Sequence, residues 1–167
     1  MIFVTVGTHE QGFERLIKKV DDLVRDGKIK EDVIMQIGFT QYKPKYCKYQ
    51  KLFPYSKMKE MVQKARIVIT HGGPASFIMA LQEGKIPIVV PRMAKYNEHV
   101  NDHQLNFVIA VKERYNNIIV IENIGELQKI IKNYNKLIEN MNINMLNNNI
   151  IFNNKLKKII EGLFEED

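Results

Sequence analysis

The sequence predicts one α/β domain in which a doubly wound parallel sheet is covered by helices on both faces. Short β-branched segments, such as 2–6 and 66–70, are typical of buried strands. The segments between them carry apolar residues at spacings of three and four, as one face of a helix does. A chain of 167 residues with 45% apolar content holds one core but not two. Strands that alternate with helices favour parallel pairing.

Local signals place the elements along the chain. Gly7 follows the first strand, while Gly27 and Gly84 stop the first and third helices, because glycine readily takes the left-handed conformation that ends a helix. Ser56 is the expected N-cap of the second helix. We expect strands at 2–6, 33–39, 51–54, 66–70, 86–91 and 118–121, and helices at 13–24, 56–65, 74–83, 99–112, 127–138 and 156–164.

The chain divides into a main domain, residues 1–139, and a different C-terminal unit, residues 140–167. The second unit begins with an asparagine-rich segment, 140–154, and asparagine favours a loop because it competes for backbone hydrogen bonds. The apolar face of the helix expected at 156–164 would pack on this domain or on a partner.

Composition excludes several classes of protein. No apolar run approaches the roughly 20 residues that cross a bilayer, and the opening residues lack the basic region of a signal peptide. Cys47 is the only cysteine, so an intrachain disulfide and a cysteine metal cluster are both excluded. We expect a cytoplasmic protein.

The chain carries an excess of positive charge. It has 25 Lys and Arg against 19 Asp and Glu, a net charge of +6, which favours an anionic partner such as nucleic acid, a phosphorylated substrate or a membrane face. The densest basic group alternates with tyrosines: Tyr42, Lys43, Lys45, Tyr46, Lys48, Tyr49 and Lys51. A solvated loop, a surface that docks on membrane phosphates or a partner protein, and a nucleic-acid surface are the alternatives.

Doubly wound sheets bind ligands beyond the carboxyl ends of their strands. This rule selects three segments, 7–12, 70–76 and 91–104. All four histidines of the chain (His9, His71, His99 and His103) fall within them, which scattered core histidines would not be expected to do.

The first of these segments, Gly7-Thr8-His9-Glu10-Gln11-Gly12, is a glycine turn that opens the first helix. It matches neither the dinucleotide fingerprint nor a Walker A loop. It supplies backbone N–H groups, a threonine hydroxyl and a histidine, and a helix start favours a phosphate. A simple turn is the alternative.

The second segment, Thr70-His71-Gly72-Gly73-Pro74-Ala75-Ser76, gives a stronger signal. Two glycines let the backbone approach a ligand, and Pro74 suits the first turn of a helix. That helix start offers unpaired N–H groups, and Ser76 adds a hydroxyl, so a diphosphate is the expected occupant. A structural turn is the alternative, and a lipase-like oxyanion hole is disfavoured because the chain has no GxSxG elbow.

The third segment carries polar side chains that suit a sugar. Asn101, Asp102 and Gln104 can hydrogen-bond sugar hydroxyls, and Arg92 can neutralise a phosphate. His99 and His103 have the i,i+4 spacing of metal ligands on a helix, but no third ligand is obvious, so no metal is expected. A solvated helix end is the alternative.

Taken together, these motifs resemble a known family. The run THGGPASFIMALQEGKIPIVVPR followed by NEHVNDHQ is similar to the donor-binding half of GT-B glycosyltransferases of the MurG-like, family-28 C-terminal type. The opening VTVGTHEQGFERL resembles the start of the small capsule and exopolysaccharide subunits that pair with a membrane-associated partner. The resemblance runs from Met1 to about Phe107 and implies that residues 1–139 are a single Rossmann-like half-domain that binds a nucleotide sugar.

The resemblance also implies roles for individual residues. It places a UDP-sugar donor against Gly7, Thr8, His71, Gly72, Gly73, Ser76, Arg92, Glu98, His99, Asn101, Asp102 and Gln104. Relatives commonly carry a ribose-binding Glu at the position of Met79, and Glu83 is the candidate substitute. Neither a cofactor nor a metal is implied.

The implied reaction is inverting transfer of the sugar to a polyprenyl-pyrophosphate-linked saccharide, with His9 and Glu10 as candidates for the base. A GT-B enzyme needs two Rossmann-like domains. A membrane-associated partner subunit would therefore complete the site and hold the chain at the inner face of the membrane. A non-catalytic nucleotide-binding subunit is the main alternative; a nucleic-acid-binding protein is another, although the chain shows no nucleic-acid motif.

Overall fold

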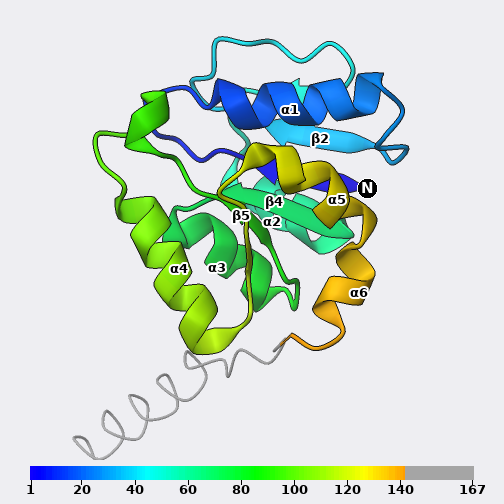
Figure 1. The fold of residues 1–167 in the computed structure, drawn as a ribbon. Coiled ribbons are helices and arrows are strands. Elements are labelled where there is room, and N and C mark those ends of the chain that lie inside the picture. The colour runs from blue at the N-terminus through cyan, green and yellow to red at the C-terminus, as the bar shows by residue number, and fades with distance from the viewer. Residues whose placement is uncertain (142–167) are drawn as a thin grey trace, which may run out of the picture.

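The computed structural model describes residues 1–141 as a six-stranded sheet between layers of helices (Figure 1). The strands follow the order β3-β2-β1-β4-β5-β6, and every neighbouring pair is parallel. Their bounds are β1, Ile2–Thr5; β2, Val33–Gln36; β3, Lys48–Gln50; β4, Ile67–His71; β5, Ile88–Val90; and β6, Ile119–Val120. The predicted doubly wound parallel sheet is therefore confirmed.

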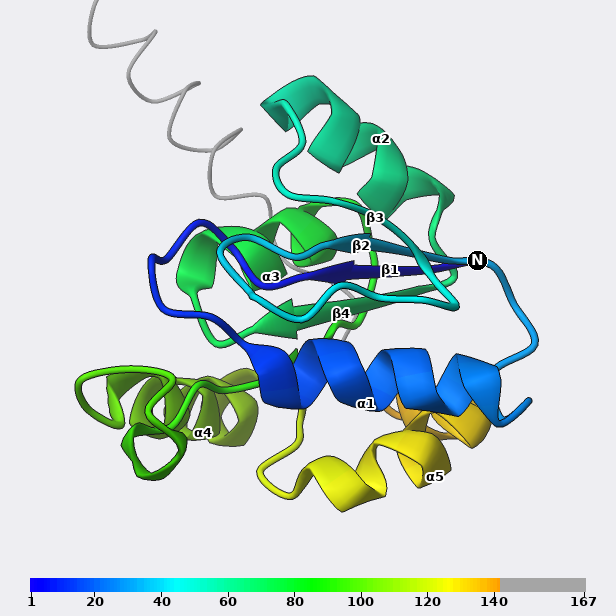
Figure 2. The same ribbon diagram turned by 90° about the horizontal axis from the view of Figure 1, so that it is seen from above.

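The helices cover both faces of the sheet. Figure 2 shows α1 and α5 on one side of it and α2 and α3 on the other. The bounds are α1, Glu14–Arg25; α2, Tyr55–Lys64; α3, Pro74–Gln82; α4, His103–Tyr115; α5, Leu127–Lys132; and α6, Tyr134–Ile138, with 3₁₀ turns η1, Ala94–Tyr96, and η2, Ile124–Glu126. Among the residues described, no helix combines the length and apolar character that a membrane span needs.

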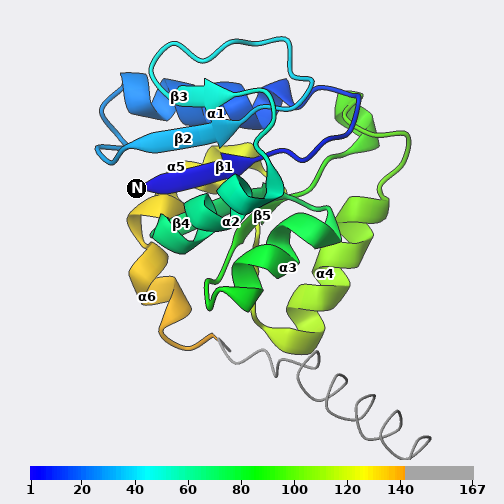
Figure 3. The same ribbon diagram turned by 180° about the vertical axis from the view of Figure 1, so that it is seen from behind.

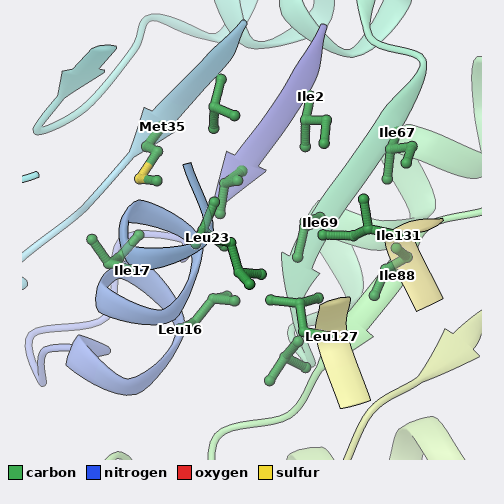
Figure 4. Close-up of a cluster of buried hydrophobic side chains, with 14 of the residues drawn as sticks. Ile2, Leu16, Ile17, Leu23, Met35, Ile67, Ile69, Ile88, Leu127 and Ile131 are labelled. Atoms are coloured by element: carbon green, nitrogen blue, oxygen red, sulfur yellow. The ribbon is translucent and has the colours of Figure 1, made fainter. Parts of the chain in front are cut away.

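The larger hydrophobic cluster lies between the sheet and helices α1 and α5 (Figure 4). Ile2 of β1, Leu16 of α1 and Leu127 of α5 are fully buried in it. On the opposite face, Phe3 and Val68 pack with α2 and α3. Because helices cover both faces of the sheet, β1 and β4 carry apolar residues on both of their faces. Helix α1 is apolar only on the side that faces the sheet.

Several element bounds differ from the expectations. Strands β2 and β5 are shorter than predicted, and the prediction that Ser56 is the N-cap of α2 is wrong, because the N-cap is Pro54. The third strand is Lys48–Gln50 rather than 51–54, because this edge strand exposes all three residues and so lacks an apolar signature. The fourth helix begins at His103 rather than at residue 99. Asn97 has left-handed backbone, and the Asp102 carboxylate accepts the Ala94 N–H at 2.8 Å, so the chain turns before the helix starts.

The helix expected over 127–138 is two short helices, α5 and α6, that meet at Asn133. The Asn133 side-chain amide donates to the Lys129 carbonyl at 2.8 Å and so competes with the helix for that acceptor. Apart from residues 140 and 141, the predicted second unit lies outside the described residues, as does the helix expected at 156–164.

The switch point of the sheet lies between β1 and β4. These two strands are neighbours, yet the helices that follow them, α1 and α3, pack on opposite faces. The loops after the two strands therefore separate at the carboxyl edge of the sheet, which is where folds of this kind bind their ligands.

Candidate functional site

The three segments selected from the sequence meet at the carboxyl edge of the sheet. In Figure 1 the loop after β1 and the loop after β5 run beside each other at this edge. The Gln11 side-chain amide donates to the Asn97 carbonyl at 3.4 Å, and the ring centroids of His9 and His99 are 5.0 Å apart. The structure therefore joins residues that are far apart in the sequence.

His71, the last residue of β4, is wedged between two glycines. A Cβ at Gly7 would lie 2.5 Å from His71 Cε1, and a Cβ at Gly73 would overlap His71 Nε2. Gly7 also has φ of 73°, a left-handed conformation that favours glycine. The two glycines therefore allow the ends of β1 and β4 to close around the imidazole.

The His71 imidazole is neutral near pH 7. Only 9% of the residue is exposed. Burial, followed by the charge of Arg92, lowers the pKa of His71 to about 4. Its Nδ1 has no hydrogen-bond partner within residues 1–141. In this arrangement His71 fills space between the loops and carries no charge.

The amino end of α3 faces this junction without a side-chain cap. Gly73 is the N-cap and Pro74 the first helical residue, and none of the described side chains caps the helix. Ser76 lies half-buried in the first turn, which contains no acidic residue. Unpaired N–H groups and the positive end of the helix dipole make such an end attractive to an anion.

Arg92 is fully buried beneath the loop that follows β1. Its guanidinium donates to the carbonyl groups of Val6 at 3.0 Å, Gln11 at 2.9 Å, Gly12 at 2.8 Å and Glu98 at 3.2 Å. Burial lowers the pKa of Arg92 to about 10, so the group is charged at neutral pH. In this arrangement Arg92 holds the loop in place, and direct contact with a phosphate stays a prediction.

Glu98 is also buried and pairs with Arg15 of α1. Its two carboxylate oxygens accept two N–H groups of Arg15, each at 2.8 Å, and one accepts the Met93 N–H at 3.2 Å. Arg15 further donates to the Pro91 carbonyl at 2.9 Å and lies 4.5 Å from the Tyr96 ring centroid. Sequence reasoning missed Arg15, because nothing in the local pattern separates it from an ordinary solvated arginine on a helix.

His9 and His99 both accept a backbone N–H through Nδ1. His9 Nδ1 accepts the Gln11 N–H at 3.1 Å, and His99 Nδ1 accepts the Asn101 N–H at 3.4 Å. A neutral imidazole that accepts at Nδ1 carries its proton on Nε2. Burial, followed by the charges of Arg92 and His99, lowers the pKa of His9. His9 is thus an N–H donor in this geometry, whereas Glu10 beside it is an exposed side chain.

The three predicted sugar-binding side chains each bind the backbone through one oxygen. These contacts are Asn101 Oδ1 with the His103 N–H at 3.2 Å, Asp102 Oδ1 with the Ala94 N–H at 2.8 Å, and Gln104 Oε1 with the Gly72 and Arg92 N–H groups at 3.1 and 3.2 Å. The second polar atom of each side chain makes no hydrogen bond to the described residues.

Two further expectations concern metal and ribose. His103 begins α4 while His99 precedes it, so the two do not share a helix, and the described residues contain no group of three or more potential metal ligands. Met79 is partly buried and packs against the hydrophobic cluster that contains Phe3 and Val68. The expectation that Glu83 replaces a ribose ligand is wrong. Glu83 is the C-cap of α3, at the opposite end from Gly73, and accepts the Gln63 side-chain amide at 3.0 Å.

A cavity of about 550 Å³ opens at the other, amino edge of the sheet. It is lined by the 28–31 segment, Arg66 and side chains of α5 and α6. It shares no residue with the three segments, and parallel sheets of this type bind ligands at their carboxyl edge. We therefore place the candidate site at the carboxyl edge.

Solved structures share this fold. The chain matches a structure described as the glycotransferase of kitacinnamycin with a TM-score of 0.57 and 14% identity, covering 83% of this chain and 35% of that one. The match to the glycosyltransferase SnogD from Streptomyces nogalater has a TM-score of 0.51 and 18% identity, and it covers 79% of this chain and 34% of that one. The match to CalG4, the calicheamicin glycosyltransferase, has a TM-score of 0.50 and 13% identity, and it covers 78% of this chain and 33% of that one. At these identities the likeness shows the fold alone.

The chain spans about a third of the length of these structures, as one Rossmann-like half of a GT-B fold does. No curated protein matches it in sequence. The model of the glycosyltransferase family 28 C-terminal domain, however, matches residues 1–163, nearly the whole chain. The chain therefore belongs to the glycosyltransferase family 28 C-terminal domain family.

Proposed function

We propose that the chain is the donor-binding subunit of an inverting glycosyltransferase. It takes a sugar from a UDP-sugar and transfers it to a polyprenyl-pyrophosphate-linked saccharide in capsule or exopolysaccharide synthesis. Family membership supports glycosyl transfer in general. The observation that carries the site is the uncapped amino end of α3, which follows Gly72 and Gly73 at the switch point of the sheet.

The donor diphosphate would lie against the amino end of α3. Pro74 has no N–H, and the Ser76 N–H donates to the Gly73 carbonyl at 3.1 Å. The Ala75 N–H and the Ser76 hydroxyl would therefore donate to the diphosphate oxygens, with Gly7 and Thr8 on the opposite side. The sugar would be held by the polar atoms that the backbone leaves unused on Asn101, Asp102 and Gln104. These are two amide N–H₂ groups and one carboxylate oxygen, which match hydroxyls as donors and acceptor.

The transfer is a direct displacement at the anomeric carbon. The acceptor hydroxyl oxygen forms the new C–O bond, the bond to the UDP oxygen breaks, and the acceptor proton passes to a base. His9 and Glu10 are the candidates, and the hydrogen bonding favours Glu10, because His9 Nδ1 already accepts the Gln11 N–H. The His9 Nε2–H would then donate to the charge that develops on the leaving diphosphate.

A membrane-associated partner subunit would complete the site at the inner face of the membrane. The chain has one Rossmann-like domain, and its match covers only about a third of each solved structure. This partner would supply the second half of the site, including the surface that presents the acceptor.

Binding of UDP, measured by isothermal titration calorimetry, tests the donor site. Ser76→Ala should weaken binding about tenfold, the effect of one hydrogen bond to a charged group. Ser56→Ala is the matched control, because Ser56 lies in the first turn of α2, where no ligand is expected. Equal affinities for the two variants would show that the diphosphate binds elsewhere.

Turnover with membranes that contain the partner tests the chemistry. A panel of radiolabelled UDP-sugars identifies the donor, and Glu10→Gln should then reduce transfer far more than Glu113→Gln, an exposed control on α4. If His9→Ala and Glu10→Gln both retain near-normal turnover, the base lies in the partner. UDP binding without transfer of any sugar would instead identify a non-catalytic nucleotide-binding subunit.

A further inference from the structure

The segment from residue 39 to residue 55, called here the β3 edge segment, has an unusual surface. Five of the ten exposed large apolar side chains in the described part of the chain lie in it: Phe39, Tyr46, Tyr49, Leu52 and Tyr55. Figure 3 shows β3 as the outermost strand of the sheet, so no further strand covers it. Apolar groups gathered on one exposed edge indicate a surface for contact with a partner.

The same segment is basic and contains no acid. It carries Lys43, Lys45, Lys48 and Lys51, and the sequence has no Asp or Glu between Asp32 and Glu60. Within the described residues none of these four lysines forms an ion pair. Lys51 Nζ lies 4.4 Å from the ring centroid of Phe39 instead. The positive charge is therefore available to an anionic partner.

Hydrogen bonds hold the segment in a fixed shape. The fully buried Asp21 carboxylate accepts the Tyr42 hydroxyl at 2.7 Å and the N–H groups of Lys45 and Tyr46, both at 2.9 Å. Burial opposes ionisation of Asp21, but these hydrogen bonds outweigh it and lower the pKa of the carboxyl. The backbone is thus anchored from inside, while the Tyr46 and lysine side chains point to solvent.

The residue types favour a lipid surface over nucleic acid or protein. The stretch 33–59 supplies its charge through lysine alone and contains no arginine. Arginine is the usual choice where phosphate or base edges are read in a fixed geometry, and lysine is depleted at protein interfaces. Lysine as a mobile point charge, combined with tyrosine as an amphipathic ring, is instead typical of the boundary between membrane and water.

We propose that the β3 edge segment docks this chain on an anionic phospholipid membrane. Lysines would contact lipid phosphates, and Tyr46, Tyr49 and Leu52 would enter the headgroup layer. The segment also borders the candidate site, because the Gln41 N–H donates to Glu14 at 2.7 Å and Thr40 Oγ1 accepts the Phe13 N–H at 3.1 Å. Docking of this segment requires neither the donor nor the acceptor of the proposed function.

Co-sedimentation of the full chain with vesicles tests this proposal. We expect binding to vesicles of phosphatidylcholine with phosphatidylglycerol, loss of binding at high salt, and none to phosphatidylcholine alone. The triple variant Lys43→Ser, Lys45→Ser, Lys48→Ser should bind about a hundredfold more weakly, since each lysine contributes about fivefold. The control triple Lys112→Ser, Lys129→Ser, Lys132→Ser removes the same charge from exposed positions on α4 and α5 and should bind nearly as the parent does.

A fluorescence readout locates the contact independently of charge. The chain has no tryptophan, so Tyr49→Trp introduces a single reporter into β3, and Tyr115→Trp introduces one at the end of α4. Emission of the Tyr49→Trp protein should shift to the blue on vesicles, whereas that of the Tyr115→Trp protein should not. No shift at residue 49, or equal weakening by the two lysine triples, would overturn the proposal.

Two further outcomes are informative. If single-stranded RNA displaces the protein from vesicles and binds more tightly than they do, the segment is a nucleic-acid surface and the proposal is wrong. UDP affinity is measured on every variant, and it should be unchanged by the lysine triple. Loss of vesicle binding with UDP binding intact therefore separates this proposal from the proposed donor site.

Discussion

The contact between Gly73 and His71 gives the sharpest test of how the site is built. Gly73 has φ of −75°, so alanine is compatible with its backbone, and any cost of Gly73→Ala comes from the new methyl group. That methyl would overlap His71 Nε2 and lie 3.0 Å from both Cδ2 and Cε1. The imidazole cannot swing away, because it is buried and Gly7 bounds it on the other side.

Overpacking of this kind typically costs about 1–3 kcal/mol of folding free energy. With a urea m-value of about 2 kcal/mol per molar, the unfolding midpoint of Gly73→Ala should fall by about 1 M. Urea unfolding followed by circular dichroism measures it. His71→Ala alone also destabilises, by leaving a cavity, but the double variant should cost less than the sum of the two single changes.

The refuting result is additivity. If the costs of Gly73→Ala and His71→Ala add within about 0.5 kcal/mol, the methyl group and the imidazole do not compete for space. The imidazole is then not packed tightly against Gly73. A matched control is Gly125→Ala on η2, where the nearest atom to the new methyl would be Asn123 Oδ1 at 3.1 Å, on an exposed side chain. That change should cost little.

Two further predictions concern buried charge and protonation. The pKa of His71 is about 4 in the fold against 6.5 when unfolded, so the unfolded chain takes up this proton first. The contribution of neutral His71 to the free energy of unfolding is fully present above pH 6.5. It should be lost progressively as the pH falls to about 4, by about 3 kcal/mol in total. His71→Gln should flatten that part of the stability-against-pH curve, and an unchanged curve would contradict the assignment. Arg92→Lys should destabilise the fold by more than about 2 kcal/mol, because one ammonium cannot reach four carbonyl groups and leaves some buried without a donor. Unchanged urea stability with weakened UDP binding would show instead that Arg92 contacts the phosphate.

Much of the architecture could be predicted because it depends on local patterns. The alternation of β-branched runs with helical periodicity gave the parallel doubly wound sheet, and the carboxyl-edge rule then selected three segments that do converge. Element ends were less predictable. Edge strand β3 is exposed throughout, so it has no apolar pattern, and Asn133 breaks a continuous apolar stripe through a single side-chain hydrogen bond.

Roles within the site were less predictable than its location. Arg92 and Glu98 are both polar residues beside predicted sugar-binding positions, yet the structure buries both and pairs them with the loop after β1 and with Arg15. No local signal distinguishes a charge that binds a ligand from one that binds the protein itself. The difference depends on which groups the fold brings within hydrogen-bond reach.

By itself the sequence determined the fold class, the edge of the sheet where chemistry belongs, and the family, because periodicity and short motifs are properties of neighbouring residues. Only the tertiary structure decided that His71 is a neutral wedge, that Arg92 binds four carbonyl groups, that Glu83 lies at the wrong end of α3, and that lysines and tyrosines gather beside an open strand. These properties arise from burial and from contacts between distant segments, and such contacts exist only after the chain has folded.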